Sequence, residues 1–508
     1  MTARPAAFSL VRQCCLVGAA TVLCASTARG EAWLIVPRVD VSETYSSNVT
    51  LISESPVRGW ISDISPGIRI VGGGARLKAN LDYQLDSLYY SGSPSIRQNL
   101  NSLTSSATLE AVDKWLYIDA NASIGQRNAS AFAPVATDNR SALANRAETR
   151  TVAVSPYVKG SVADLVAYQL REISTASRSD DAALANTYVT QWIGSLKNNS
   201  AGAKIGWFVD GDFINVRNDI LGSRDDNRLR AGVTIEVLPQ FNLLVSDGTE
   251  QANFDTATKK SGSTPGIGLQ WAPSPRTQLA ALAERRFFGS SHSFLLSHRT
   301  ALLNWRYSDI KDVTNLSSLL ATSGESTIAV LMSDLLAASI PDPAARAEAV
   351  RARLEQSAVT TADLTSGAVQ TSRLFINRVR DASVVWLAPR DTVELILIQR
   401  DQEALDNSTS ATDSFAQSNL IRERSATVSW THRLTPSATL NFLTTRFRTD
   451  GLSVANLTKN QLTQALSITF MVAPKTLVSV GARGTRFDSS INGSFRENAV
   501  VATLSQRF

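Results

Sequence analysis

Apolar and polar residues alternate along most of this chain. From Ala75 to Asp86 every second position is apolar, and the positions between are polar or charged. The segments Leu116–Ile124 and Ser425–Thr431 show the same period. Successive side chains of a strand point to opposite faces, so this period predicts strands with one apolar and one polar face.

Similar segments recur through the whole chain and bring the expected number of strands to about 21. They begin near Trp33, Trp60, Leu100, Glu148, Val162, Thr187, Ala203, Asn227, Pro239, Gly266, Arg276, Ser293, Thr371, Asp391, Pro436, Gln461, Lys475 and Phe495.

Short turns that contain proline join many of these segments. Proline fixes φ and has no N–H to donate, so it ends a strand and favours a tight hairpin turn. The turns lie at residues 237–240, 272–275, 388–391, 435–437 and 473–475. Other connections, such as residues 130–145, are longer and polar. Tight turns at one rim and long loops at the other are typical of an outer-membrane barrel.

The predicted fold class is therefore all-β: a large antiparallel transmembrane β-barrel of about 20 strands that occupies residues 31–508. No run of 18 apolar residues follows the N-terminal segment, so the pattern does not favour a bundle of membrane-spanning helices. A solenoid would show a sharper repeat, and a set of sandwich domains would show linkers between strands.

One region departs from the two-residue period. Ile328, Leu331 and Leu335 recur at helical spacing, and Asp342 followed by Pro343 is a typical helix start. We expect a helical insert at residues 312–368 that gates or plugs the barrel, docks a partner, or rests on the rim without a role. The strand count also has a parity mismatch: either a strand is missing between 310 and 370 or one assignment is wrong.

Residues 1–30 have the features of an export signal, with a basic start at Arg4 and Arg12 and a short apolar core. The three cysteines of the chain all fall in this segment, so the remainder has no thiol for a disulfide or metal site. The formal charge is +5 overall and about +2 without the signal. This near balance argues against nucleic-acid binding.

The C-terminus forms one more amphipathic strand, which ends on Phe508. Val500, Ala502 and Leu504 share its apolar face, and Gln506 interrupts that face. A terminal strand that ends on an aromatic residue is the expected signal for the outer-membrane assembly machinery, so Phe508 is the predicted assembly signal.

The polar strand faces are expected to line the lumen. A barrel of about 20 strands is too wide for its side chains to fill, so the lumen holds water or a plug. The lumen-facing candidates are Arg76, Lys78, Asp82, Asp86, Asp119 and Asn121.

The sequence favours neither an enzyme nor a metal or cofactor site. The histidines are His292, His298 and His432, and none has carboxylates at a ligand spacing. A lipid-facing serine hydrolase needs Ser and His on one face, whereas the neighbours Ser297 and His298 point to opposite faces. We expect no catalytic, cofactor-binding or metal residues.

Several short motifs resemble the family of PEP-CTERM system associated outer-membrane proteins. They are Val41–Val49, Arg286–Gly289 with Ser297–Thr300, Pro341–Arg346 and Arg496–Val500. The resemblance implies a Gram-negative outer-membrane protein linked to exopolysaccharide production or export and to PEP-CTERM protein sorting. The expected partners are outer-membrane lipid, the assembly machinery, and exopolysaccharide or its export components. The alternative functions are a general diffusion porin and an outer-membrane hydrolase.

Overall fold

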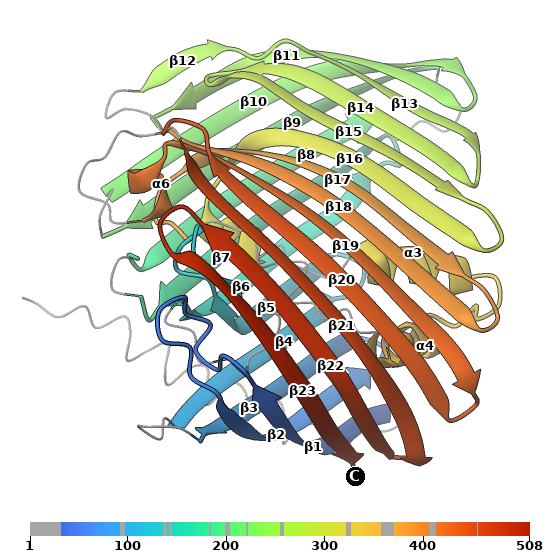
Figure 1. The fold of residues 1–508 in the computed structure, drawn as a ribbon. Coiled ribbons are helices and arrows are strands. Elements are labelled where there is room, and N and C mark those ends of the chain that lie inside the picture. The colour runs from blue at the N-terminus through green and yellow to red at the C-terminus, as the bar shows by residue number, and fades with distance from the viewer. Residues whose placement is uncertain are drawn as a thin grey trace, which may run out of the picture.

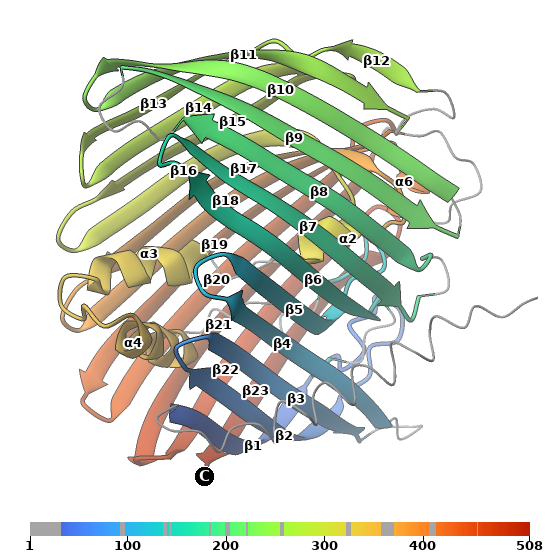
Figure 2. The ribbon, with the colours of Figure 1, turned by 180° about the vertical axis from the view of Figure 1, so that it is seen from behind.

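The computed structural model describes residues 32–91, 97–135, 140–141, 145–181, 184–198, 204–219, 222–253, 259–321, 327–356, 370–405, 413–454 and 456–508. In them one antiparallel sheet closes on itself, because the last strand, β23 (Gly493–Arg507), pairs with the first, β1 (Ala32–Ser46). Figures 1 and 2 show the barrel wall from opposite sides. β12 (Lys260–Ser263) and β13 (Gly266–Ser274) both pair with β11 (Phe241–Ala252) and form one interrupted strand, so 22 strands surround the lumen. The predicted large antiparallel barrel is confirmed.

The remaining strands follow one another around the wall in chain order. They are β2 (Gly59–Gly73), β3 (Leu77–Tyr90), β4 (Arg97–Val112), β5 (Leu116–Arg127), β6 (Ala147–Val162), β7 (Val166–Ser179), β8 (Thr187–Asn198), β9 (Ile205–Asn218), β10 (Gly222–Leu238), β14 (Thr277–Arg286), β15 (Gly289–Arg299), β16 (Leu303–Thr314), β17 (Phe375–Leu387), β18 (Asp391–Ala404), β19 (Leu420–Thr435), β20 (Ala438–Gly451), β21 (Leu457–Ala473) and β22 (Thr476–Ser489).

The two rims of the barrel differ in their connections. Each of the five predicted proline turns joins two neighbouring antiparallel strands at one rim, which we call the tight-turn rim. Ala32 and Phe508 lie at this rim too, since β1 starts there and β23 ends there. Residues 47–58 and 128–146 connect strands at the opposite, long-loop rim. In outer-membrane barrels the short turns face the periplasm and the long loops face outward.

β16 is the strand that the sequence analysis missed, and it resolves the parity mismatch. It lies directly before the insert and pairs with β15 and β17. One face of this strand carries Trp305 and Tyr307 in its first half and the charged residues Asp309 and Lys311 in its second half. The alternation of apolar and polar residues is therefore lost halfway along the strand. With this strand counted, both ends of the insert lie at the long-loop rim.

The outer surface carries an apolar band. Outward residues such as Val500 (55% exposed) and Leu504 (46%) alternate with buried inward residues such as Phe495. Aromatic residues border the band: the Tyr45 and Trp60 rings lie 5.2 Å apart toward the long-loop rim. Tryptophans at the other end include Trp386, 39% exposed. An apolar band between aromatic rows is the lipid-facing surface of an outer-membrane barrel.

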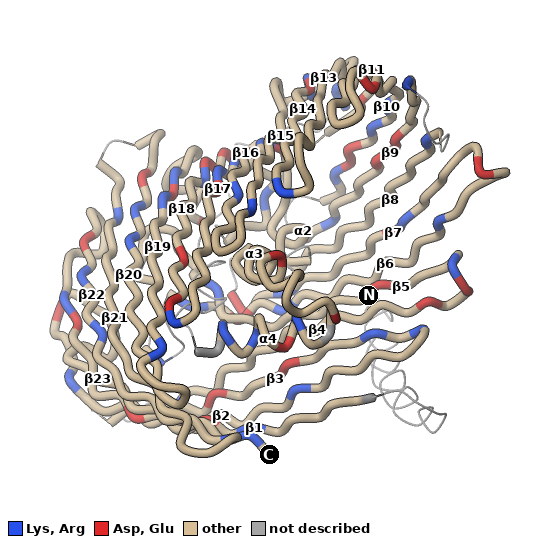
Figure 3. The backbone as a smooth tube through the Cα atoms, turned by 90° about the vertical axis from the view of Figure 1, so that its right-hand side faces the viewer, with Lys and Arg blue, Asp and Glu red and all other residues tan. Residues whose placement is uncertain are grey.

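Four helices are described, all in long-loop connections. α2 (Leu316–Ala321), α3 (Thr327–Leu336) and α4 (Pro343–Gln356) lie between β16 and β17, inside the predicted range 312–368, and α6 (Ser414–Gln417) lies between β18 and β19. Asp342 caps α4 as predicted, because its carboxylate accepts the Ala345 N–H at 2.8 Å. Seen from the tight-turn rim, α3 and α4 lie inside the ring of strands (Figure 3). None of the described helices is long and apolar enough to span a bilayer.

Candidate functional site: the occupied lumen

The α3–α4 hairpin occupies the tight-turn end of the lumen although its connections leave the wall at the opposite rim. Ile328 and Met332 of α3 are fully buried and pack against Val385 of β17 and Ile396 of β18. Val350 brings α4 into the same cluster. Apolar packing of this kind is non-directional, so it holds the hairpin to the wall without fixing one register.

A few polar contacts supplement this packing. The Asn304 amide donates to the Leu331 carbonyl at 3.1 Å, and the Arg299 guanidinium donates to the Asp334 carbonyl at 2.5 Å. Arg299 ends β15 and Asn304 is the second residue of β16, so both contacts lie beside the tight turn that joins these strands. They confirm which end of the lumen the helix occupies.

A polar cavity of about 370 Å³ lies between α3 and the wall formed by β14, β15 and β16. Its lining includes Arg276, Gln278, Ser297, Arg306 and Asp334. The cavity therefore offers hydrogen-bond donors and acceptors beside the hairpin.

The long-loop end of the lumen is narrowed by the β5–β6 connection, which folds inward. The Gln461 amide of β21 holds Val135 at two points: it accepts the Val135 N–H at 2.9 Å and donates to the Val135 carbonyl at 2.7 Å. The Phe132 carbonyl accepts from Ser489 at 3.2 Å and from Asn492 at 3.0 Å. Directional hydrogen bonds therefore fix this loop against strands distant in sequence.

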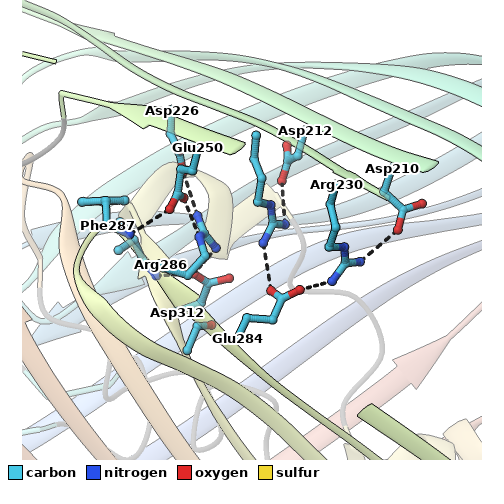
Figure 4. A network of polar contacts seen from close by, with 12 residues as sticks. Asp210, Asp212, Asp226, Arg230, Glu250, Glu284, Arg286, Phe287 and Asp312 are labelled. Atoms are coloured by element: carbon cyan, nitrogen blue, oxygen red, sulfur yellow. Dashed lines mark hydrogen bonds and ion pairs between the residues drawn. The ribbon is translucent and has the colours of Figure 1, made fainter. Parts of the chain in front are cut away.

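An ionic network crosses the inner wall between β9 and β16 (Figure 4). Arg286 donates to Glu250 at 2.5 Å, to Asp226 at 2.9 Å and to Asp312 at 3.0 Å. The second oxygen of Glu250 accepts the Phe287 N–H at 2.8 Å. The Arg286 side chain is 5% exposed and that of Glu250 1%. Burial of charge is tolerated when each group is paired, as here.

A second part of the network lies nearer the middle of the strands. Glu284 accepts hydrogen bonds from Arg228, at 3.1 Å, and from Arg230. Arg230 also donates to Asp210 at 2.9 Å, and Arg228 lies 3.7 Å from Asp212. Six carboxylates and three guanidiniums meet in the two parts together, so this stretch of wall is acidic and rich in hydrogen-bond acceptors (Figure 4).

The predicted lumen candidates occupy varied places. Asp82 pairs with Arg38 at 2.7 Å and is opposite Arg69, whose guanidinium lies 3.7 Å from Glu348 of α4. Asp82 thus shares the face that the hairpin contacts, and Asp86, four residues later, is buried on that face.

The other four candidates lie on β5 and near the β2–β3 turn. Asp119 pairs with Arg171 at 2.9 Å, and Asn121 shares its face of β5. Lys78 is exposed near the start of β3. Arg76 precedes β3, in the turn, and so lies outside the strand to which the sequence assigned it.

Sequence reasoning missed the network around Arg286. Arg286 is part of the motif Arg286–Gly289 that carries the family resemblance, but its role was not recognised. Its partners Asp226, Glu250 and Asp312 come from three other strands, and the registers that bring them together cannot be read from one chain.

Phe508 follows the last strand, β23, and extends its pairing with the first strand, β1. Its N–H donates to the Pro37 carbonyl at 3.0 Å, and its side chain is 61% exposed on the outward face that Leu504 shares. Its role as an assembly signal stays a prediction. The predicted export signal, residues 1–30, lies outside the described residues.

The histidines make contacts along the wall. His292 lies 3.1 Å from Asp309, His298 2.8 Å from the Thr277 hydroxyl, and His432 2.7 Å from Asp391. Within the described ranges, no three His, Cys, Asp or Glu side chains gather closely enough to hold a metal ion.

Among known proteins, the chain resembles solved structures in its fold. No family model and no curated protein matches the chain. The iron transporter FrpB from Neisseria meningitidis (F3-3 variant) is 9% identical, with a TM-score of 0.49, 96% of this chain covered and 83% of that one. A mutant (G324V) of the ferric enterobactin receptor PfeA from Pseudomonas aeruginosa is 9% identical, with a TM-score of 0.46, 93% of this chain covered and 80% of that one. The siderophore receptor PirA from Pseudomonas aeruginosa is 8% identical, with a TM-score of 0.43, 95% of this chain covered and 81% of that one.

The closed wall, the outward apolar band and its aromatic borders define the class of protein. The chain forms a 22-stranded β-barrel of the outer membrane.

Proposed function

We propose that the protein is a non-enzymatic conduit of the outer membrane whose α3–α4 hairpin is the gate. The observation that carries this proposal is the position of the hairpin: it packs by its apolar face against β17 and β18 inside the lumen. Barrels of this strand number enclose a lumen too wide for their side chains, so an internal element decides whether solutes pass.

The chemistry of the lumen supports a hydroxyl-rich solute. Carboxylates accept hydrogen bonds from hydroxyl groups, and the wall near Glu250 and Glu284 is rich in carboxylates. The cavity beside α3 adds amide and guanidinium donors. These features suit an exopolysaccharide chain, which is the solute class implied by the resemblance to PEP-CTERM system associated proteins. The link to exopolysaccharide export and to PEP-CTERM protein sorting is part of this proposal, as is delivery through the export signal at residues 1–30.

The test is replacement of residues 316–373 by a short turn. Thr314 and Phe375 are paired neighbours in the sheet, so the wall closes without the insert. We expect a heat-modifiable barrel whose conductance in planar bilayers rises several-fold, and a strain with altered polysaccharide export. A matched control shortens the β3–β4 connection within residues 92–96, whose flanking strand ends, Tyr90 and Arg97, lie at the same rim, and it should leave conductance unchanged.

Other outcomes identify the alternatives. Unaltered conductance and export in the insert deletion contradict the gate. A high, steady conductance of the wild-type barrel favours a general diffusion porin, and ester hydrolysis by the purified barrel favours a hydrolase.

A further inference from the structure

The outward surface near the long-loop rim is rich in arginine on one side of the barrel, from β16 to β23. The inward residues of these strands are identified by their contacts: Asn304 bonds to α3, and Phe447, Phe487 and Phe495 are buried in the lumen. Strand alternation then turns the neighbouring charged residues outward. We call this surface the outer arginine patch.

Five arginines of the patch are arranged around three aspartates. Asp309 accepts two hydrogen bonds from Arg378, at 2.6 and 2.9 Å, and Asp401 accepts one from Arg422 at 2.5 Å. Arg380 lies 3.5 Å from both Asp309 and Asp401.

The third aspartate, Asp450, pairs with Arg448 at 2.9 Å and lies 3.8 Å from Arg424. The Asp450 side chain is 12% exposed, whereas those of Arg448 and Arg424 are 48% and 46% exposed. The acids therefore lie beneath the guanidiniums, whose remaining N–H groups face outward.

Three further arginines form a row without acidic partners among the described residues. Arg446 of β20 is opposite Leu462, Leu462 is opposite Arg486 of β22, and Arg486 is opposite Arg496 of β23. All three arginines are exposed. Like charges directly opposite on neighbouring strands are destabilising, and an anion between the guanidiniums of Arg486 and Arg496 would relieve their repulsion.

The patch borders the apolar band. Along β23 the outward residues run from Arg496 through Asn498 to Val500, and along β21 Leu462 is followed by Leu466, 50% exposed. The arginines therefore lie at the level where lipid headgroups meet the barrel, on the side of the long loops. With Lys311, Asp488 and Glu403, which face outward on the same strands, the patch has nine basic and five acidic side chains.

We propose that the outer arginine patch binds phosphate groups of lipids in the outer leaflet, with one phosphate between Arg486 and Arg496. Guanidinium and phosphate form paired, charge-assisted hydrogen bonds, and Arg side chains at an interface extend toward headgroups. Because the patch faces the membrane beside the apolar band, the phosphate it meets belongs to a lipid. This inference concerns the outer surface and does not depend on the gate.

The test uses the purified full chain reconstituted in phosphatidylcholine vesicles with or without bisphosphorylated lipid A. The quantity measured is lipid A retained per barrel as a function of its fraction in the vesicle. A basic residue near an anionic surface contributes about fivefold in affinity, so R486Q/R496Q should weaken retention roughly 25-fold and R446Q about fivefold. The control R217Q/R285Q removes two exposed outward arginines, from β9 and β14, that have no arginine opposite them, and should retain lipid A like the wild type.

The outcomes separate the sources of phosphate. Retention by R486Q/R496Q equal to that of the wild type overturns the proposal, as does complete competition by inorganic phosphate or by a soluble anionic polysaccharide. If the double variant does not fold, as judged by the absence of the heat-modified band in phosphatidylcholine vesicles, the proposal is tested with R446Q and the charge-preserving R486K/R496K instead. R446Q is then expected to lose retention, and R486K/R496K is expected to keep most of it.

Discussion

The two ends of the lumen are narrowed by elements that differ in the balance of apolar packing and hydrogen bonds. At the tight-turn end, α3 and α4 are held mainly by apolar packing around Ile328 and Met332. At the long-loop end, residues 128–135 are held by hydrogen bonds to Gln461 and Ser489 as well as by packing of the buried Phe132 ring. The Arg286 network lies in the wall toward the same end.

This difference indicates which end moves. A hydrogen bond weakens steeply when its geometry is distorted, so the Gln461 contacts specify one position of the β5–β6 loop. Apolar contact depends mainly on the area buried, and a helix can slide or lift while it keeps much of that area. The long-loop end is therefore the fixed constriction, and the hairpin is the part suited to displacement.

The largest effect is expected for I328D. The substitution places an unpaired carboxylate in the apolar cluster at a fully buried position, which costs several kcal/mol. The hairpin should leave the wall, and single-channel conductance should rise several-fold toward that of the insert deletion. The control A347D carries the same charge on the exposed face of α4. A folded I328D barrel with wild-type conductance would show that apolar packing is not what retains the hairpin.

Next in size is R286M, which tests the rigid end. It leaves Asp226, Glu250 and Asp312 close together without their cation, and removal of one partner from a buried charge cluster costs about 3–5 kcal/mol. The temperature of heat modification on gels should fall clearly. R285M removes the adjacent, outward arginine and should change this temperature little. Equal temperatures for the two variants would mean that the network does not stabilise the wall.

A moderate effect is expected for Q461A. It removes both hydrogen bonds to Val135 and leaves a buried N–H and C=O unsatisfied, at a cost of about 1–3 kcal/mol. Limited proteolysis should then cut the β5–β6 loop faster than in Q464A, which changes an exposed outward glutamine of the same strand. No difference in cleavage rate between Q461A and Q464A would contradict fixation of the loop by Gln461.

The smallest effect is expected for E348Q. The Arg69–Glu348 pair spans 3.7 Å with the Glu348 side chain 49% exposed, and an exposed ion pair contributes less than about 1 kcal/mol. Conductance should be unchanged at low and at high salt. A clear rise in conductance would show that this ion pair, in addition to the apolar cluster, keeps α4 in place.

Most of the wall could be predicted from the sequence because each strand has one face toward lipid and one toward the lumen. The prediction failed at β16, where Asp309 and Lys311 stand on the outward face. Those residues lie at the level of the lipid headgroups, beyond the apolar band, where the outward face is no longer apolar, so the pattern that reveals strands is lost there.

The position of the plug could not be predicted in the same way. Helical spacing revealed α3, and Asp342 marked the start of α4, but neither states where the helices rest. Their place depends on the missed strand and on contacts with Val385 and Ile396, which lie more than 40 residues beyond the end of α3. The Arg286 network has the same origin, since it requires the registers of several strands at once.

The insertion point of the plug has a consequence for conformational entropy. Thr314 and Phe375 are adjacent in the sheet, so their pairing closes a loop that contains the whole insert. The entropic cost of closing such a loop grows only with the logarithm of its length, by about 0.6 kcal/mol for each doubling. The length of the insert can therefore change widely at this connection while the strand pairing that builds the wall is hardly affected.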